Sequence, residues 1–385
     1  MLLLKRAHVY APEKIGIKDI LIGEEKILAM QDFIDEKAMK KQFPELTVID
    51  VNEKAVVPGI IDPHVHITGG GGEASFCSRI EEIKVEICIE SGVTTVIGLH
   101  GTDRRTRTVA NVVAKARGLT QEGITAFCLT GAYEYPSVSL MDNIADDIVF
   151  VPEVLGVKLA ISDHRCSTPT VEELIRIGSQ ARIASLMGGK PGIVHLHTGV
   201  GKNGLKYVIE AVENSDIPIA HFVPTHIRIK TPYVDEFVRM GGGIDLTSGE
   251  DPTMTIKRLK HFLKVGNTDQ ITVSSDANGS MPKWNEKREM IGFTAAKLTL
   301  LNLLRALVKD GMPLEKALLF MTENTAKRWK IYPKKGCLQV GSDADMLVFD
   351  ADMNLDAVIA RGTVKQSNLK EVNFEKGGFF GILKK

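Results

Sequence analysis

The sequence lacks an excess of charge of either sign. Its 385 residues include 48 Lys and Arg and 48 Asp and Glu, so the formal net charge is zero. Nucleic acids and anionic membranes favour proteins with a basic face, and we therefore expect neither to be the main partner. Hydrophobic residues make up 44% and charged residues 25%, which is ordinary for a globular protein and argues against disorder, collagen-like repeats and a coiled coil.

Cysteine and long apolar runs are also scarce. The five cysteines are an odd number, and no two have Cys-x-x-Cys spacing, so we expect no disulfide scaffold and favour a reducing compartment. No run approaches the ~20 apolar residues of a membrane span, and the three leucines after Met1 are too few for a signal peptide. We expect a soluble, cytoplasmic protein without a membrane partner.

Both ends of the chain have the pattern of short β-strands separated by turns. The segments with this pattern are residues 2–10, 15–28, 48–57, 336–341 and 344–349. Because the middle of the chain differs, we predict one small β-sandwich domain formed by both termini, from residues 1–57 and 336–385.

The middle of the chain alternates apolar β-like runs with segments of helical spacing. Ile80, Ile83 and Ile87 repeat at helical spacing, and residues 171–184 keep the same period. Eight β/α units in this length predict an α/β fold, a (β/α)8 barrel over residues 58–335. The eight runs are residues 60–67, 94–99, 124–129, 156–161, 192–197, 217–223, 243–246 and 271–273.

A doubly wound parallel sheet is the alternative architecture. That fold carries a glycine fingerprint after its first strand, and the sequence has none there. The segment 199–202 is similar to a phosphate-binding loop but lacks its glycine spacing and the Ser or Thr after the lysine. The barrel is therefore favoured.

Polar residues gather where the predicted strands end, which is the catalytic face of a barrel. His64 and His66 are two residues apart on the first strand and point to the same side. His197, His226 and Asp276 end the fifth, sixth and eighth strands. Taken alone, His64 and His66 could be two polar residues at a barrel mouth, His197 and His226 could be hydrogen-bonded core residues, and Asp276 could be a turn residue. Their coincidence on one rim favours a metal site.

Lys158 lies inside the apolar run of the fourth strand. An unpaired ammonium buried there is costly, so two interpretations stay open. The stem of the lysine packs while its head reaches solvent, or a lysine of depressed pKa reacts with carbon dioxide. The resulting carbamate has two oxygens, and each can bind one divalent ion.

Several segments resemble known enzymes. The segment 58–66 (PGIIDPHVH) is similar to the first-strand signature of the amidohydrolase superfamily, and 336–345 (GCLQVGSDAD) resembles its closing β segment. More narrowly, four segments resemble the isoaspartyl dipeptidase family: 69–73 (GGGGE), 129–133 (LTGAY), 160–165 (AISDHR) and 274–280 (SSDANGS). The resemblance runs in register over essentially the whole chain.

The resemblance implies a dinuclear zinc site. His64, His66 and Asp276 would bind the more buried zinc, and His197 and His226 the second, with carboxylated Lys158 and a hydroxide bridging the pair. Asp276 would be the general base and then the general acid. Tyr133 would donate to the oxyanion of the tetrahedral intermediate.

The resemblance also implies the substrate, a β-aspartyl dipeptide, and its contacts. Glu73 would pair with the α-ammonium group and Arg165 with a carboxylate, with Thr102 and Ser280 as polar contacts. Gly71 belongs to a glycine run that either lets the backbone approach the ligand closely or is a flexible loop. A large homo-oligomer, such as an octamer, is implied as well.

The sequence departs from the family at one position. A second substrate-binding arginine is expected three residues after the histidine of strand six, and Ile229 stands there. Arg228 and Lys230 are the candidates to replace it. If neither does, recognition of a carboxylate is weakened.

Two other functions compete with dipeptide hydrolysis. The first is another dinuclear amidohydrolase, acting on cyclic amides or N-acyl amino acids; Glu73 and Arg165 argue against a cyclic amide, which carries neither matching charge. The second is a barrel that lost catalysis and serves in assembly. Loss of metal ligands would accompany that change, and the expected set is complete.

Overall fold

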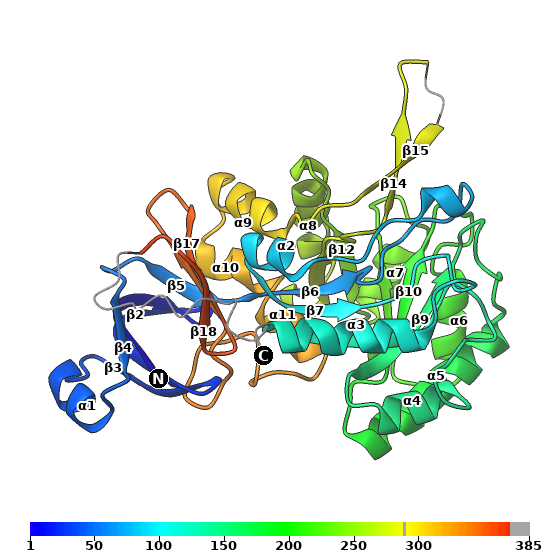
Figure 1. Ribbon diagram of the computed structural model, residues 1–385. Coiled ribbons are helices and arrows are strands. Elements are labelled where there is room, and N and C mark those ends of the chain that lie inside the picture. Colours follow the sequence, from blue (N-terminus) through cyan, green and yellow to red (C-terminus); the bar gives the residue numbers. More distant parts are fainter. Residues whose placement is uncertain (288–289, 370–385) are drawn as a thin grey trace.

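The structure is a computed structural model that describes residues 1–287 and 290–369. Figure 1 shows a curled β-sheet near the N-terminus and, beside it, a larger body in which helices surround strands. The predicted fold class, a (β/α)8 barrel with a small β domain, is confirmed. The predicted domain limits stay a prediction, and residues 370–385 of the C-terminal part lie outside the described residues.

An eight-stranded sheet combines strands from both ends of the chain. β16 pairs antiparallel with β5, so that Leu347 lies opposite Val57. Alternate residues of this sheet, among them Leu4, Val9 and Ile20, form a core of their own. The strands are β1 (Leu2–Tyr10), β2 (Lys14–Gly23), β3 (Lys26–Gln31), β4 (Thr47–Asp50), β5 (Ala55–Pro58), β16 (Met346–Phe349), β17 (Leu355–Ala360) and β18 (Thr363–Ser367).

The barrel strands follow one another around the ring in chain order. Six form one parallel sheet in the order β11-β10-β9-β8-β7-β6, and β12 pairs with β13. The ring closes between its last and first strands, where the N–H of Ser275 donates to Asp62 at 3.2 Å. The strands are β6 (Ile60–Val65), β7 (Val93–Gly98), β8 (Thr125–Gly131), β9 (Val154–Ile161), β10 (Ile193–Thr198), β11 (Phe222–Thr225), β12 (Ile244–Thr247) and β13 (Ile271–Ser274).

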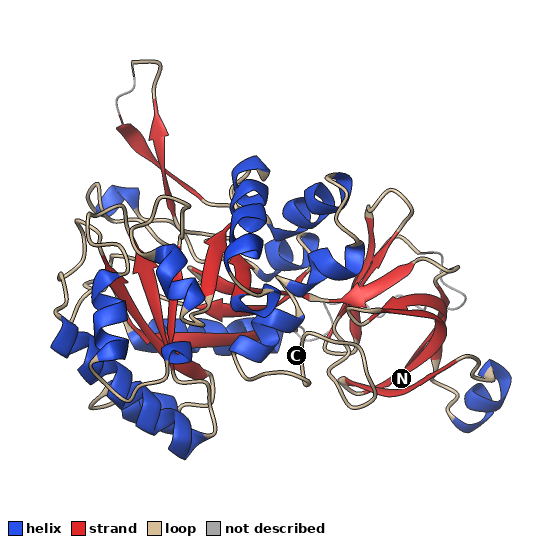
Figure 2. Cartoon of the chain, turned by 180° about the vertical axis from the view of Figure 1, so that it is seen from behind, coloured by secondary structure: helices blue, strands red, loops and turns tan. Residues whose placement is uncertain are grey.

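Most helices lie around the barrel strands (Figure 2). The two longest begin at capping boxes, Thr108 with Asn111 and Thr170 with Glu173, which satisfy the first free N–H groups. The helices are α1 (Glu36–Gln42), α2 (Val85–Glu90), α3 (Val109–Glu122), α4 (Ile144–Phe150), α5 (Val171–Gly188), α6 (Lys206–Glu213), α7 (Val234–Arg239), α8 (Thr253–Val265), α9 (Leu300–Lys309), α10 (Leu314–Leu319) and α11 (Glu323–Arg328).

Three sequence-based predictions need correction. The sixth strand is four residues long and starts at Phe222, because a 3-10 turn over Ile219–His221 occupies part of the predicted run. Ile80 and Ile83 precede α2, because their N–H groups bond to the loop after β6, at Gly70 and Ile67. The segment 336–341 forms turns rather than a strand. Its two glycines have φ of 82° and 91°, outside the β region.

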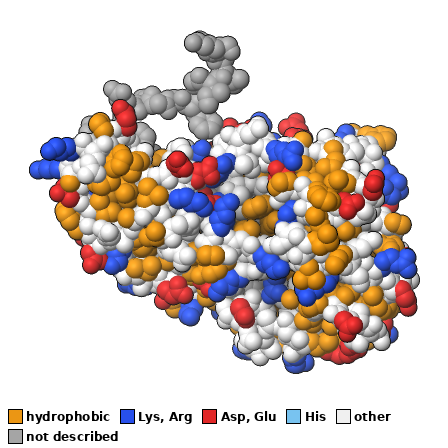
Figure 3. Space-filling view, turned by 90° about the horizontal axis from the view of Figure 1, so that it is seen from below, with side chains coloured by type: hydrophobic (Ala, Val, Ile, Leu, Met, Phe, Trp, Pro, Cys, Tyr) orange, Lys and Arg blue, Asp and Glu red, His pale blue; other side chains and the backbone are white. Residues whose placement is uncertain are grey.

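A hairpin of β14 (Ser280–Trp284) and β15 (Met290–Ala295) projects from the body (Figure 1). On the face shown in Figure 3, basic and acidic side chains are interspersed among apolar ones, as the zero net charge leads one to expect. Among the helices of the described residues, none is both long and apolar enough to cross a membrane.

A buried lysine ties the chain between the barrel and β16 to the barrel itself. Lys335 is 2% exposed. Its Nζ lies 2.9 Å from a carboxylate oxygen of Asp343 and also pairs with Asp345. The same Nζ donates to the hydroxyl of Thr125, at the start of β8, at 2.6 Å. Lys26 of β3 also pairs with Asp343 at 2.5 Å. One charge cluster therefore joins β3, the barrel and the approach to β16.

We expect Lys335→Met to lower the free energy of unfolding by about 3–5 kcal/mol, because removing one partner leaves buried carboxylates uncompensated. Urea denaturation followed by circular dichroism measures the change. Lys334→Met removes the same charge from an exposed neighbour and is expected to change stability little. Equal stability of the two variants would contradict the role of Lys335.

Candidate active site

The predicted metal ligands converge at the carboxyl ends of the barrel strands. His64 lies in β6 and His66 just beyond it, Lys158 in β9 and His197 in β10. The last two, His226 and Asp276, follow β11 and β13. These two have φ of 61° and 56°, a left-handed conformation that costs non-glycine residues energy and is concentrated at functional sites.

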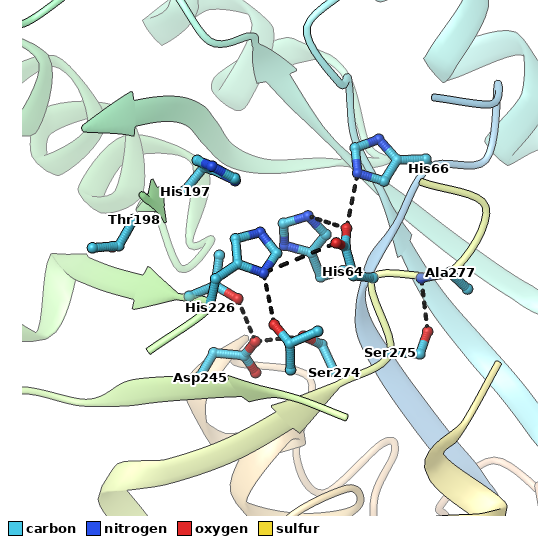
Figure 4. Close-up of polar contacts among 12 residues, drawn as sticks. His64, His66, His197, Thr198, His226, Asp245, Ser274, Ser275 and Ala277 are labelled. Atoms are coloured by element: carbon cyan, nitrogen blue, oxygen red, sulfur yellow. Dashed lines mark hydrogen bonds and ion pairs between the residues drawn. The ribbon is translucent and has the colours of Figure 1, made fainter. Parts of the chain in front are cut away.

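Three imidazoles face the carboxylate of Asp276 (Figure 4). Its oxygens lie 3.0 Å from Nε2 of His66, 3.3 Å from Nε2 of His64 and 4.0 Å from Nδ1 of His226. One donor atom from each of His64, His226 and Asp276 lies within 4.8 Å of the others, a group that could hold a metal ion. The ring of His197 lies 4.5 Å from that of His226.

Lys158 is fully buried beside this group. Its Nζ lies 3.1 Å from Nε2 of His64. Burial lowers the pKa of Lys158 to about 7, although the charges of Asp276 and Asp245 oppose the shift. The whole side chain of Lys158 is enclosed. This excludes the interpretation in which the head of the lysine reaches solvent.

Burial keeps three histidines of the site neutral, His64, His197 and His226. Burial, followed by the charge of Lys158, holds the pKa of His64 well below its usual value. Burial likewise holds the pKa of His226 well below its usual value and lowers that of His197 to about 4. Neutral imidazoles keep the nitrogen lone pair that binds a metal ion. The geometry and protonation therefore fit a cation site.

A second group of charged residues adjoins the histidines. Asp163 accepts from His197 and from Nε and Nη2 of Arg165, each at 2.9 Å. Burial opposes its ionisation, but these bonds outweigh burial and hold the pKa of Asp163 well below its usual range. Nη1 of Arg165 lies 3.5 Å from Glu73. The hydroxyl of Tyr133 lies 2.8 Å from Nδ1 of His197.

The other predicted contacts are distributed around this centre. Ser280 donates to Glu73 at 2.9 Å, and the buried hydroxyl of Thr102 has no hydrogen-bond partner among the described residues. Arg228 and Lys230 are both exposed, but only Arg228 is among the residues that line the cavity beside His197 and His226. Gly71 has φ of 86°, and a Cβ there would lie 2.2 Å from the carbonyl of Ser78. A side chain at this position would therefore clash within the loop itself.

His195 and Asp163 were not expected as site residues. Nε2 of His195 lies 2.8 Å from Nδ1 of His64, so the second nitrogen of His64 faces Lys158 and Asp276. The His-x-His spacing of 195–197, the same as that of 64–66, was the available signal. Asp163 lies in the segment 160–165 that resembles the narrower family, but its partners are visible only in three dimensions.

A model of the amidohydrolase family matches residues 55–370. The chain belongs to the amidohydrolase family. This amidohydrolase is 38% identical to a beta-aspartyl dipeptidase from Fervidobacterium islandicum AW-1, solved in complex with a beta-Asp-Leu dipeptide. The match covers 97% of this chain and 100% of that one, with a TM-score of 0.87, and it confirms the resemblance found in the sequence.

Two more distant relatives differ in activity. This amidohydrolase is 24% identical to an L-hydantoinase from Paenarthrobacter aurescens, over 91% of this chain and 86% of that protein. An N-acetylglucosamine-6-phosphate deacetylase from Pasteurella multocida is 17% identical with a TM-score of 0.66, covering 95% of this chain and 100% of that one. The latter likeness shows the fold alone.

We expect His195→Leu to weaken the binding of divalent metal about 10- to 100-fold, because a ligand imidazole loses the partner that fixes its orientation. Competition with a chromogenic chelator measures the affinity. His195→Gln keeps an acceptor and should lose less. His221→Leu removes another buried histidine, one whose Nδ1 bonds to Gly192 at 2.8 Å, and should keep the wild-type affinity. Unchanged affinity in His195→Leu would contradict the assignment.

Proposed function

We propose that this amidohydrolase hydrolyses the isopeptide bond of β-aspartyl (isoaspartyl) dipeptides. The observation that carries the proposal is the pairing of Glu73 with Arg165, 3.5 Å apart, in contact with the histidine cluster through Asp163. An isoaspartyl unit has an ammonium and a carboxylate on one carbon, and an acid beside a guanidinium matches both. The similarity to the Fervidobacterium enzyme supports the same assignment.

We propose that this donor set holds two zinc ions. His64, His66 and Asp276 would hold one ion and His197 and His226 the other, with Lys158, as its carbamate, between them; imidazole and carboxylate are ligands that zinc accepts. When bound, the two ions would supply a hydroxide near neutral pH by lowering the pKa of a shared water. The position of Lys158 Nζ, 3.1 Å from His64, supports its place in this set.

Asp276 and Tyr133 would move and hold protons during the reaction. Asp276 would accept the proton of the attacking water and pass it to the leaving amine, as general base and then acid. Burial raises the pKa of Tyr133 well above its usual value, so its hydroxyl keeps the proton that it would donate to the oxyanion. Its 2.8 Å contact with His197 places that hydroxyl at the cluster.

The remaining contacts would orient the dipeptide. Glu73 would bind the α-ammonium, held in place by the hydroxyl of Ser280. Arg165 would bind the α-carboxylate on the same carbon. The unpartnered hydroxyl of Thr102 would donate to or accept from the same end of the substrate, since a buried hydroxyl is costly without a partner. Gly71 would place the loop backbone close to it.

Hydrolysis of a cyclic amide is the second candidate, favoured by the similarity to an L-hydantoinase. A cyclic amide offers no ammonium to Glu73, so it leaves one charge of the Glu73–Arg165 pair without a counterpart. We further propose that the protein works in the cytoplasm as a homo-oligomer, as the family resemblance implies. Sedimentation analysis would measure the oligomeric state.

We expect zinc-loaded protein to hydrolyse isoaspartyl-leucine and to leave α-aspartyl-leucine and dihydroorotate essentially unchanged. The physical reason is that the pair of Glu73 and Arg165 fits the charges on the isoaspartyl carbon. Release of leucine, followed by chromatography, and loss of dihydroorotate absorbance are the measurements. Faster turnover of dihydroorotate than of isoaspartyl-leucine would favour the cyclic-amide function instead.

Lys158→Ala is expected to lose most bound zinc and most activity, because it removes the proposed bridge between the two ions. Zinc content is measured by mass spectrometry, and added short carboxylic acids should partly restore both properties by taking the place of the carbamate. Lys202→Ala, in an exposed loop, is the matched control. Wild-type zinc content in Lys158→Ala would refute the carbamate.

A further inference from the structure

Two guanidinium groups that line the active-site cavity have no carboxylate partner in the part of the chain that the structure describes. Arg228 and Arg258 belong to the lining of a cavity of about 520 Å³ that also includes His197, His226 and Asp276. Arg228 follows β11, whereas Arg258 comes from the middle of α8. Within residues 1–287 and 290–369, no carboxylate lies within ion-pair distance of either arginine.

Arg258 reaches the centre through a short chain of contacts. Its Nη1 donates to the carbonyl of Thr247 at 3.4 Å. The hydroxyl of the same Thr247 lies 2.7 Å from Nδ1 of His226. Thr247 alone therefore separates the guanidinium of Arg258 from His226, a proposed metal ligand. In the sequence, Arg258 lies 32 positions after His226.

The two arginines are close enough to repel each other. Burial lowers the pKa of Arg258, and the positive charge of Arg228 lowers it further. Two acidic residues of the cavity lining have other partners: Glu250 pairs with Lys297 at 2.8 Å, and Asp251 accepts from Thr253 at the start of α8. Arg228 is exposed and Arg258 is partly buried, and like charges held close together are stabilised when an anion lies between them.

Arg165 differs from this pair, because its charge is already largely neutralised. Asp163 takes two of its N–H groups in a bidentate bond, and Glu73 lies beside a third nitrogen. Arg165 with Glu73 accounts for the two charges on the isoaspartyl carbon. A dipeptide has one more carboxylate, at its C-terminus on the other side of the scissile bond, and that group needs a cation of its own.

We propose that Arg258, together with Arg228, binds the C-terminal carboxylate of the dipeptide. The inference rests on the proposed function and adds to it the residues that select the leaving amino acid. Arg258 would thereby take the role of the second substrate-binding arginine, which the family resemblance leads us to expect at position 229, where this chain has Ile229. A planar guanidinium binds a carboxylate through two parallel bonds, a geometry that lysine does not offer.

The test compares two substrates that differ only at the C-terminus, isoaspartyl-leucine and isoaspartyl-leucinamide. The zinc-loaded wild type is expected to prefer the acid over the amide in kcat/KM. In Arg258→Met, kcat/KM for the acid should fall about 10- to 100-fold while that for the amide stays within about twofold, because charge-assisted bonds are lost only with the acid. Arg228→Met should show the same pattern, and Arg258→Lys should keep part of the preference.

Lys257→Met is the matched control, since it removes an exposed positive charge from the neighbouring position of α8. It should keep the wild-type ratio of the two substrates. The ratio also separates binding from folding, because a loss of folded enzyme lowers both rates equally. A wild-type ratio in Arg258→Met would overturn the inference alone. A wild type that hydrolyses neither substrate would overturn the proposed function and the inference with it.

Discussion

The whole centre depends on the burial of Lys158 among neutral imidazoles. A charged ammonium enclosed in a barrel costs several kcal/mol unless it is compensated. The carboxylates that contact the histidine cluster among the described residues are those of Asp276 and Asp163, and Lys158 forms an ion pair with neither. Burial therefore favours the uncharged amine, and it lowers the pKa of His64 and His226 in the same way. A site with neutral imidazoles and nearby carboxylates is an environment that favours a divalent cation.

Two deeper carboxylates hold the strands that carry these ligands. Asp62 accepts from the backbone and the hydroxyl of Ser275, directly before Asp276, and so joins the first strand to the last. Burial raises the pKa of Asp62 to about 7, against the effect of the hydrogen bonds from Ser275. Asp245 accepts from Thr225 at 2.7 Å, directly before His226. Each carboxylate thus fixes the residue next to a proposed ligand. The contacts that close the barrel therefore also set the geometry of the site.

The sequence predicts the fold correctly where the hydrophobic pattern of a segment matches its burial in the structure. Barrel strands buried on both faces, such as β9, read as continuous apolar runs, and for the same reason Lys158 stood out within one. Strand six was misplaced because the apolar residues before Phe222 belong to a 3-10 turn, which hydrophobicity does not distinguish from a strand. The spacing of Ile80 and Ile83 was helical, but their backbone bonds go to the loop after β6.

Side-chain partners were less predictable than strand ends, for a physical reason. A residue at a strand end is placed by the barrel itself, so His64, His66 and Asp276 could be assigned to one rim. Arg258 lies on a helix whose register against β12 decides whether its guanidinium reaches Thr247 or solvent, and no local pattern encodes that register. The same holds for His195, because its role depends on its contact with His64, which is visible only in the structure.

The zero net charge conceals an ordered separation of charge within the site. Glu73, Asp163 and Arg165 form a group that contains charges of both signs, whereas Arg228 and Arg258 place two positive charges near each other. A substrate with a zwitterionic carbon at one end and a single carboxylate at the other has the complementary distribution. Electrostatic complementarity of this kind sets specificity and orientation more than affinity. Under the proposed function, this asymmetry would fix which carbonyl is brought to the histidine cluster, and a cyclic amide, which carries only part of that distribution, would be oriented poorly.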